Sequence, residues 1–424
     1  MRSPIACMAA ALLALLLTAN AHAETPPVTQ GTVREEPAQP DPVALLDQTE
    51  KIVSERYYNR AALPAFRDTL DSYRETARTA ADVGTAIAEA LRTLGGTHTG
   101  RFTPDQIEYY ELMDIFRPAG TDKNGDAIVP GGRIDYAGIG MVPRRIDGRL
   151  FVAQLYGGAP ALKAGLRVGD EILSVDGKPY EPIASFKDHV FGSVTFQIRR
   201  HADAPPLDIG VPVVQMYPNR SLREAIRQSV RIIEQDGRRI GYLRIWTYAA
   251  GGMNALLTEI LSSETLRSTD GLVLDLRSRW GGSASEAAEF FLGRARDMTV
   301  IDRNGKEKAV IARFRKPLVA IVDQNTRSSM EIFAYSLQQA GVPLIGTKTA
   351  GAVLAARAFL LDDHSLLELA VSDVKIDGKQ LEGVGVTPGI AVPFDIRYAA
   401  GADPQFDRAL IELTRILNVP AIPI

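Results

Sequence analysis

A serine at the junction of a strand and a helix is the residue of this chain that is best placed to act as a nucleophile. Residues 317–322 (PLVAIV) form a short apolar run rich in β-branched side chains, which predicts a buried strand. The apolar residues Met330, Phe333 and Leu337 then recur at helical spacing. The change of period therefore falls at Ser328. A serine at such a turn is exposed, and the first N–H groups of the following helix point toward the carbonyl group that its hydroxyl would attack.

A helix cap is the simpler interpretation of the same residues. Serine is a preferred N-cap residue, so either Ser328 or Ser329 could fill that role. Glu331 could complete a capping box with Ser328. Because capping serines are common, the residues alone favour the cap over the nucleophile.

A serine nucleophile needs a base, and histidine is the usual one. After residue 23 the histidines are His98, His189, His201 and His364. His98 follows the predicted helix of residues 80–94 and its terminal Gly95-Gly96. A histidine at that position is commonly solvated or interacts with the helix dipole, so its location alone does not make it a base.

The N-terminus has the organisation of a secretory signal peptide. Met1 and Arg2 precede an apolar run over residues 9–17, and a small-residue cleavage site ends at Ala23. We expect cleavage after Ala23, a periplasmic or secreted location, and a disordered linker over residues 24–42. The signal occupies residues 1–23 and is too short to remain as a membrane span. No later stretch approaches the roughly 20 apolar residues that a membrane helix requires.

Composition excludes several classes of partner and chemistry. The formal net charge of −3 indicates neither a nucleic acid nor an anionic membrane. The single cysteine, Cys7, lies in the signal, so the mature chain has neither a disulfide nor a thiol nucleophile. The glycine turn at 281–282 lacks the lysine of a P-loop and the glycine spacing of a dinucleotide site. We expect no metal ion and no cofactor, and the oligomeric state stays open.

The order of the predicted elements divides the mature chain into three parts. With 424 residues the chain is long enough for two or three domains. Residues 43–118 form an N-terminal helical region, residues 134–218 contain short strands with glycine turns, and residues 219–424 alternate strands and helices. The pattern predicts a multidomain α+β protein. In its last part, residues 284–292 are expected to form a helix, and residues 359–361 and 366–371 a hairpin around a turn that contains His364.

Two segments around Ser328 resemble the active-site region of the S41 family, the C-terminal processing and tail-specific serine proteases. They are residues 327–334 (RSSMEIFA) and 346–351 (GTKTAG). The resemblance implies that residues 219–424 form an α/β catalytic core of the crotonase-like ββα type and that Ser328 is the nucleophile. It also implies an oxyanion hole built from the N–H group of Gly281 or Gly282 and, as second donor, that of Ser329.

The S41 family uses two kinds of base, and the resemblance favours histidine. The lysine of the serine/lysine branch would fall within residues 351–353 (GAV), which contain none, and nearby Lys348 aligns with a non-catalytic position. In the tricorn-like branch a histidine follows a serine and is supported by a glutamate. Those roles would fall on His98, on Thr97, which keeps a hydroxyl group, and on Glu382.

Residues 157–177 (GGAPALKAGLRVGDEILSVDG) resemble a PDZ signature. The resemblance implies a PDZ domain over residues 134–218 that binds the C-terminus of a protein or peptide substrate as an added strand. The backbone N–H groups that would hold the terminal carboxylate are those of Gly138, Ile139, Gly140 and Met141. Residues 185–189 leave room for only a short groove helix, so the peptide specificity stays open.

Three functional hypotheses follow. The first is an exported, PDZ-containing serine endopeptidase that acts through an acyl-enzyme on protein substrates. The second is a catalytically inactive scaffold that binds peptides, which the missing lysine favours. The third is an acyl-CoA enzyme of the crotonase type, against which the signal peptide argues.

Overall fold

The computed structural model describes residues 42–117, 133–282, 286–294, 298–310 and 313–419. The predicted signal peptide and nearly all of the predicted linker, residues 1–41, lie outside this part of the chain. Within the described ranges, no helix has the length and apolar character needed to cross a membrane.

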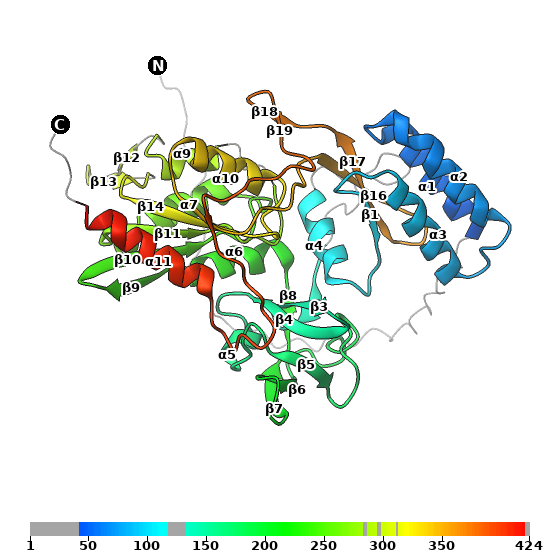
Figure 1. Ribbon diagram of the computed structural model, residues 1–424, viewed down its shortest axis with the longest axis horizontal. Helices are drawn as coiled ribbons and strands as arrows, with labels where there is room; N and C mark the ends of the chain where they lie inside the picture. Colours follow the sequence, from blue (N-terminus) through cyan, green and yellow to red (C-terminus); the bar gives the residue numbers. More distant parts are fainter. Residues whose placement is uncertain (1–41, 118–132, 283–285, 295–297, 311–312, 420–424) are drawn as a thin grey trace, which may run out of the picture. The chain divides into compact units, whose positions relative to one another are not determined.

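A six-stranded sheet forms the centre of the C-terminal half of the chain (Figure 1). Its strands, in spatial order, are β20 (Ile390–Ala391), β15 (Leu344–Gly346), β14 (Leu318–Val322), β11 (Gly271–Asp275), β10 (Arg238–Arg244) and β9 (Arg231–Gln235). All neighbours pair in parallel except β9 and β10, which are antiparallel. Every residue of β11 and β14 is buried, which explains why the predicted strand at 317–322 is a continuous apolar run.

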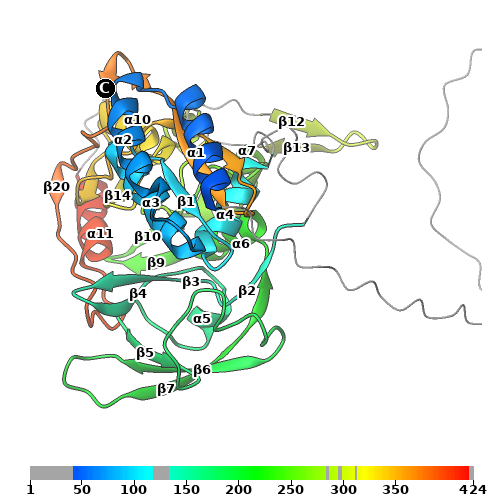
Figure 2. The same ribbon diagram turned by 90° about the vertical axis from the view of Figure 1, so that its right-hand side faces the viewer.

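Helices cover both faces of this sheet (Figure 2). They are α6 (Pro218–Ser229), α7 (Met253–Leu261), α8 (Glu264–Arg267), α9 (Ala287–Phe291), α10 (Ser329–Gln339) and α11 (Pro404–Leu417). Successive strand residues point to opposite faces. Val273 accordingly packs in one cluster with Leu413 of α11, and Leu274 in another with Phe333 of α10. The helix predicted over residues 284–292 is shorter than expected, and residues 283–285 lie outside the described part.

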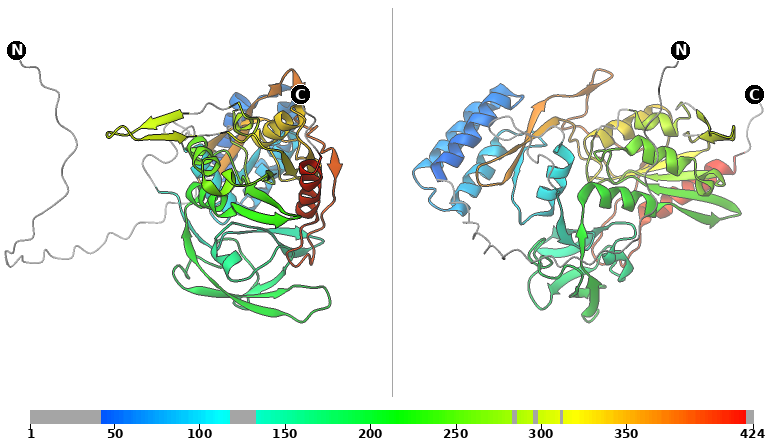
Figure 3. Two further views of the ribbon diagram at one scale, coloured as in Figure 1. Left: turned by 90° about the vertical axis from the view of Figure 1, so that its left-hand side faces the viewer. Right: turned by 180° about the vertical axis from the view of Figure 1, so that it is seen from behind.

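The N-terminal helices share a core with strands from much later in the chain (Figures 1 and 3). These elements are α1 (Pro42–Arg56), η1 (Arg60–Ala62), α2 (Leu63–Arg74), α3 (Ala80–Thr93), β16 (Ala355–Leu360) and β17 (Leu366–Ser372). Thr79 and Asp82 form a capping box at the start of α3, which confirms the predicted helix near residues 80–94. The predicted hairpin around residues 362–365 is confirmed as β16 and β17.

Strand β1 (Gly100–Phe102) extends this hairpin sheet by pairing antiparallel with β17. Gly100 lies opposite Glu368 in that register. The chain then continues into α4 (Ile107–Phe116), a helix that was not predicted from the sequence. The pairing fixes the position of the residues that immediately precede β1, among them His98.

A second, five-stranded sheet lies within the segment predicted to be a PDZ domain. Its order is β3 (Met141–Ile146), β4 (Arg149–Leu155), β5 (Glu171–Val175), β6 (Ser193–Arg199) and β7 (Leu207–Pro212). Strands β2 (Tyr136–Gly138) and β8 (Val214–Met216) pair beside it, and α5 (Pro160–Lys163) follows β4. The short helix predicted at 185–189 is wrong, because residues 182–188 form only turns. So short a segment gains too few bonds to offset the cost of nucleating a helix.

Two small hairpins complete the described elements. One consists of β12 (Met298–Ile301) and β13 (Glu307–Val310), and the other of β18 (Lys375–Ile376) and β19 (Lys379–Gln380). Glu382 follows the second hairpin closely. The mixed helix-and-sheet architecture predicted from the sequence is confirmed.

Candidate active site

Ser328 has a strained backbone and a hydroxyl that does not cap α10. Its φ of 58° and ψ of −134° lie in a region that non-glycine residues rarely adopt, at a cost of about 1–3 kcal/mol. Its side chain makes no capping hydrogen bond, and the buried hydroxyl of Ser329 has no partner among the described residues. Ser328 therefore occupies the N-cap position of α10, but neither serine caps the helix through its hydroxyl. The backbone N–H of Ser328 donates to the Ala352 carbonyl over 2.7 Å, which helps hold the turn.

The glycine turn approaches Ser328 so closely that no side chain would fit. A Cβ atom at Gly281 would lie 2.3 Å from Ser328 Cβ and 2.6 Å from its Oγ. Gly282 has a φ of 120°, and a Cβ there would lie 2.1 Å from the Ala249 nitrogen. Only glycine therefore suits either position. The structure thus brings Gly281 against Ser328, while α10 begins at Ser329 on the other side of the serine.

The orientation of the peptide group between Gly281 and Gly282 follows from its carbonyl. The Gly281 oxygen accepts hydrogen bonds from Tyr248 N over 2.7 Å and from Thr247 Oγ1 over 3.2 Å. In a trans peptide the next N–H points the opposite way, so the N–H of Gly282 is directed away from Tyr248. The N–H of Ser329 belongs to the first turn of α10, where it has no intrahelical acceptor. Both groups are chemically suited to hold an oxyanion.

A series of hydrogen bonds joins His98 to Glu382 through Thr97. Thr97 Oγ1 lies 3.0 Å from His98 Nδ1 and donates to Glu382 Oε2 over 3.0 Å. The backbone N–H groups of Thr97 and Val353 also donate to the Glu382 carboxylate, over 3.1 and 2.6 Å. The Thr97 hydroxyl has one proton, so when it donates to Glu382 it must accept from Nδ1–H. That arrangement leaves the other ring nitrogen of His98, Nε2, unprotonated and basic.

His98 and Ser328 line one cavity of about 470 Å³, together with Gly281 and Gly282. His98 has a left-handed backbone with a φ of 53°. Burial, reinforced by the positive charge of Arg327, lowers the pKa of His98 to about 3. The imidazole is therefore neutral at physiological pH, which is the form that accepts a proton.

Lys348 is exposed and does not line the cavity that contains Ser328. The structure therefore gives no support to a lysine base at that position. His364 lies in the turn between β16 and β17 with a φ of 62°, as the predicted turn requires.

Glu331, which the sequence suggested only as a capping residue, holds the loop beside Ser328. It is fully buried, and its carboxylate accepts from Thr349 Oγ1 over 2.5 Å and from the backbone N–H groups of Gly351 and Ala352 over 2.7 Å each. Burial raises the pKa of Glu331, and these hydrogen bonds oppose that shift. The Ala352 carbonyl in turn accepts from Ser328 N–H. An acidic residue in the first helical turn was the only sequence signal for this role.

The predicted carboxylate cradle forms the turn between β2 and β3. Gly138 ends β2 and Met141 begins β3. The Ile139 carbonyl accepts from Ala161 N–H over 3.0 Å, and Gly140 has a φ of 73° that favours glycine. Binding of a carboxylate by these N–H groups stays a prediction.

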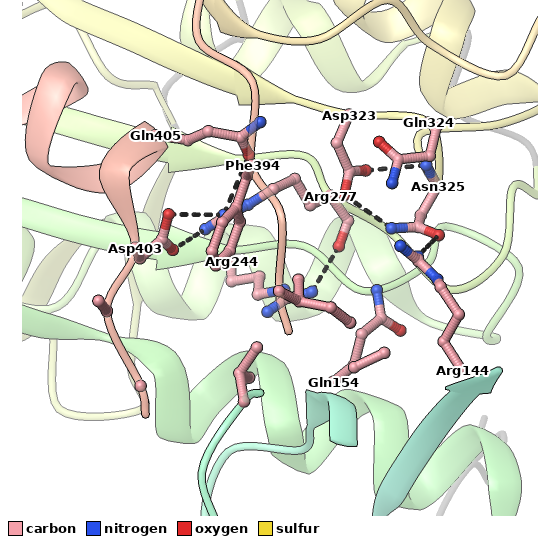
Figure 4. Close-up of a pocket in the computed structure, with 15 residues that line it drawn as sticks. Arg144, Gln154, Arg244, Arg277, Asp323, Gln324, Asn325, Phe394, Asp403 and Gln405 are labelled. Atoms are coloured by element: carbon pink, nitrogen blue, oxygen red, sulfur yellow. Dashed lines mark hydrogen bonds and ion pairs between the residues drawn. The ribbon is translucent and has the colours of Figure 1, made fainter. Parts of the chain in front are cut away.

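A second cavity, of about 90 Å³, is lined by paired charges (Figure 4). Arg277 donates to Asp275 over 2.7 Å and to Asp403 over 2.7 Å. Arg144 Nη2 donates to Asn325 Oδ1 over 2.7 Å, and Asn325 Nδ2 donates to Asp323 over 2.6 Å. The cluster thus holds the chain that leads from β14 into Ser328.

Burial would raise the pKa of Asp275, but Arg277 and Arg244 hold it well below its usual range. We therefore expect Arg277→Ala to lower the free energy of unfolding by about 3 to 5 kcal/mol, because the buried Asp275 carboxylate loses its main cationic partner. That carboxylate keeps the Tyr242 hydroxyl, a backbone N–H and the more distant Arg244. Urea denaturation followed by circular dichroism measures this. The control is Arg227→Ala, which breaks a more exposed pair with Glu259 and should cost about 0 to 1 kcal/mol. Equal losses in both variants would contradict the expectation.

These features are those expected of a serine-type hydrolase site, and part of the chain matches a known protein family. Residues 239–392 match Peptidase family S41. The carboxy-terminal processing protease CtpA of Bacillus subtilis is 26% identical over 271 residues, which cover 60% of this chain and 56% of that protein. The carboxyl-terminal-processing protease of Synechocystis is 25% identical over 346 residues, covering 75% of this chain and 76% of that one. The part of the chain that contains Ser328 and the glycine turn thus matches the S41 peptidases, as the sequence predicted.

Solved structures show the same fold. The tricorn protease aligns with a TM-score of 0.51 at 19% identity, over 89% of this chain and 37% of its own. A putative S41 protease from Bacteroides fragilis aligns with a TM-score of 0.51 at 16% identity, over 87% of this chain and 97% of its own.

Proposed function

We propose that this protein is an exported serine endopeptidase that cleaves protein substrates, with Ser328 as nucleophile and His98 as general base. The observation that carries the proposal is the hydrogen-bonded series from Glu382 through Thr97 to His98, which ends in the cavity that also contains Ser328. The match to a peptidase family is consistent with it.

The arrangement suits acyl-enzyme chemistry. The Ser328 oxygen attacks the substrate carbonyl while His98 Nε2 accepts the hydroxyl proton. The oxyanion accepts hydrogen bonds from the N–H groups of Ser329 and the glycine turn at 281–282. The C–N bond then breaks, and His98 returns the proton to the leaving amine. Water then attacks the ester carbonyl while His98 Nε2 accepts its proton, the C–O bond to Ser328 breaks, and His98 returns the proton to the serine oxygen.

Residues 134–218 are proposed to form a PDZ domain that binds the C-termini of substrates. Two observations support this role, the five-stranded sheet of β3 to β7 and the glycine turn at 138–141. A C-terminal peptide would add a strand at a sheet edge and place its carboxylate on the N–H groups of that turn. The N-terminal sequence supports a periplasmic or secreted location.

A catalytically inactive, peptide-binding scaffold is the alternative. This alternative is favoured by the absence of a lysine, because Ala352 occupies the position where the serine/lysine branch of the family has its base. A site based on His98 needs no lysine, so the scaffold is the less favoured function.

Fluorophosphonate labelling of the chain from Glu24 tests the proposal. We expect one covalent adduct, which peptide mass mapping assigns to Ser328, because only an activated serine reacts with this probe. Lack of an adduct in a folded protein that still binds C-terminal peptides would favour the scaffold.

A further inference from the structure

The cavity beside Ser328 has apolar walls and two ionisable groups that the proposed mechanism does not use. The walls are formed by Leu112, Ile115, Phe116, Tyr248, Trp280, Leu354 and four alanines. The two unused ionisable groups are Glu368 of β17 and Arg327, which precedes the nucleophile. An apolar cavity with one or two polar groups is typical of a site that selects a particular side chain.

Glu368 is buried without a partner. It is 4% exposed and lines the cavity, its oxygens are not among the fully enclosed atoms without a partner, and no hydrogen bond or ion pair joins its carboxylate to another group in the described ranges. Two other buried glutamates differ in this respect. Glu331 accepts from Thr349 and two backbone N–H groups, and Glu111 accepts from Arg279, Tyr156 and Trp280. A buried carboxylate without such bonds costs stability, which makes a ligand the natural partner of Glu368.

Arg327 does not supply the missing partner. It forms no ion pair with Glu368, and its guanidinium lies 5.5 Å from the centre of the Trp280 ring. Burial raises the pKa of Glu368, and the charge of Arg327 opposes that shift from a distance. Arg327 therefore weakens the negative potential of the cavity without providing a hydrogen bond to the Glu368 carboxylate.

We propose that Glu368 determines specificity by receiving a lysine or arginine side chain of the substrate, the one next to the carbonyl that Ser328 attacks. This inference rests on the proposed peptidase activity. The apolar stem of such a side chain would pack against Leu354 and the residues of α4. Its charged end would donate to the Glu368 carboxylate, which forms a charge-assisted hydrogen bond.

Paired peptides that differ by a single amino group test the inference. Lysine and norleucine have the same stem, and only lysine has the charged end. Internally quenched peptides carry one or the other at the residue before the cleavage site, which mass spectrometry locates. We expect the wild-type protein to favour lysine over norleucine by about tenfold to hundredfold in kcat/KM. A preference for norleucine, or for a glutamate that Arg327 would attract, overturns the inference.

Glu368→Gln should bring the lysine-to-norleucine ratio close to one while norleucine peptides are still cleaved. Glu368→Asp should restore part of the preference, which a merely structural role would not predict. The matched control is Glu264→Gln, which removes one exposed carboxylate outside the cavity and should leave the ratio unchanged. An unchanged ratio in Glu368→Gln overturns the inference and leaves the peptidase intact. Absence of both cleavage and Ser328 labelling in the wild-type protein overturns the peptidase itself, and the inference with it.

Discussion

Replacing Ser328 with alanine is expected to abolish peptide hydrolysis and fluorophosphonate labelling while the protein stays folded. The Ser328 side chain makes no capping hydrogen bond, so its loss removes the nucleophile without removing a structural contact. In a comparable serine site, loss of the nucleophile lowers kcat by about 10⁶. The rate of cleavage of a quenched peptide measures the loss, and circular dichroism verifies the fold.

His98→Ala should have an effect of similar size, because the serine and its base act as one unit. The double variant should therefore be no slower than either single variant. Ser329→Ala is the matched control, since it removes the neighbouring hydroxyl and keeps the backbone N–H. Full activity in Ser328→Ala, or loss of activity only in Ser329→Ala, would contradict the assignment of the nucleophile.

Glu382→Gln is expected to lower kcat by about 10⁴. The amide of glutamine can donate a hydrogen bond to Thr97, whose hydroxyl would then donate to His98 Nδ1. The proton of the imidazole would move to Nε2, so the nitrogen that must accept the serine proton would no longer be basic. The variant also loses the negative charge that stabilises the imidazolium formed during the reaction.

Two substitutions at Thr97 distinguish a role of its hydroxyl in orienting His98 from a purely structural role. Thr97→Ser keeps the hydroxyl and should retain activity close to the wild type, whereas Thr97→Val keeps the shape and should lose most of it. All variants should show similar melting temperatures. Equal activity of Thr97→Val and Thr97→Ser would contradict a role for the hydroxyl in positioning His98.

The pH dependence of kcat/KM tests the hydrogen-bonded series of Glu382, Thr97 and His98 independently of these substitutions. The pKa of His98 is lowered to about 3, so its imidazole is unprotonated above that pH. Its ability to accept a proton is lost only as the pH falls through that value. The acid limb of kcat/KM for the wild-type protein should therefore lie well below pH 6.5, the ordinary pKa of histidine. An acid limb near pH 6.5 would contradict the buried state of His98.

Local patterns were sufficient to predict much of the fold. The apolar run at 317–322 predicted β14 because a strand buried on both faces favours apolar residues at successive positions. The helical spacing after Ser328 predicted α10, and the hairpin at 359–371 followed from two apolar runs around a polar turn. Each of these signals depends only on residues that are close together in the chain. Signals of the same kind did not predict α4, and they extended α9 too far.

Resemblance to the S41 family suggested the members of the site, but the chain alone did not indicate that they meet. Thr97 and Glu382 are separated by 285 positions in sequence. They come together because β1 pairs with β17 and the loop at 349–353 folds beside Ser328. Such contacts depend on the whole packed chain, which local periodicity does not record.

Two features of the site were decided by the tertiary structure alone. Local residue types favoured Ser328 as a helix cap and the S41 resemblance favoured it as a nucleophile, and only the folded chain shows that its hydroxyl makes no capping bond. Glu368 gave no sequence signal, because its neighbours read as an ordinary strand. The cost of a buried charge depends on what surrounds it, and only the folded chain leaves this carboxylate without a partner in the cavity that also contains Ser328.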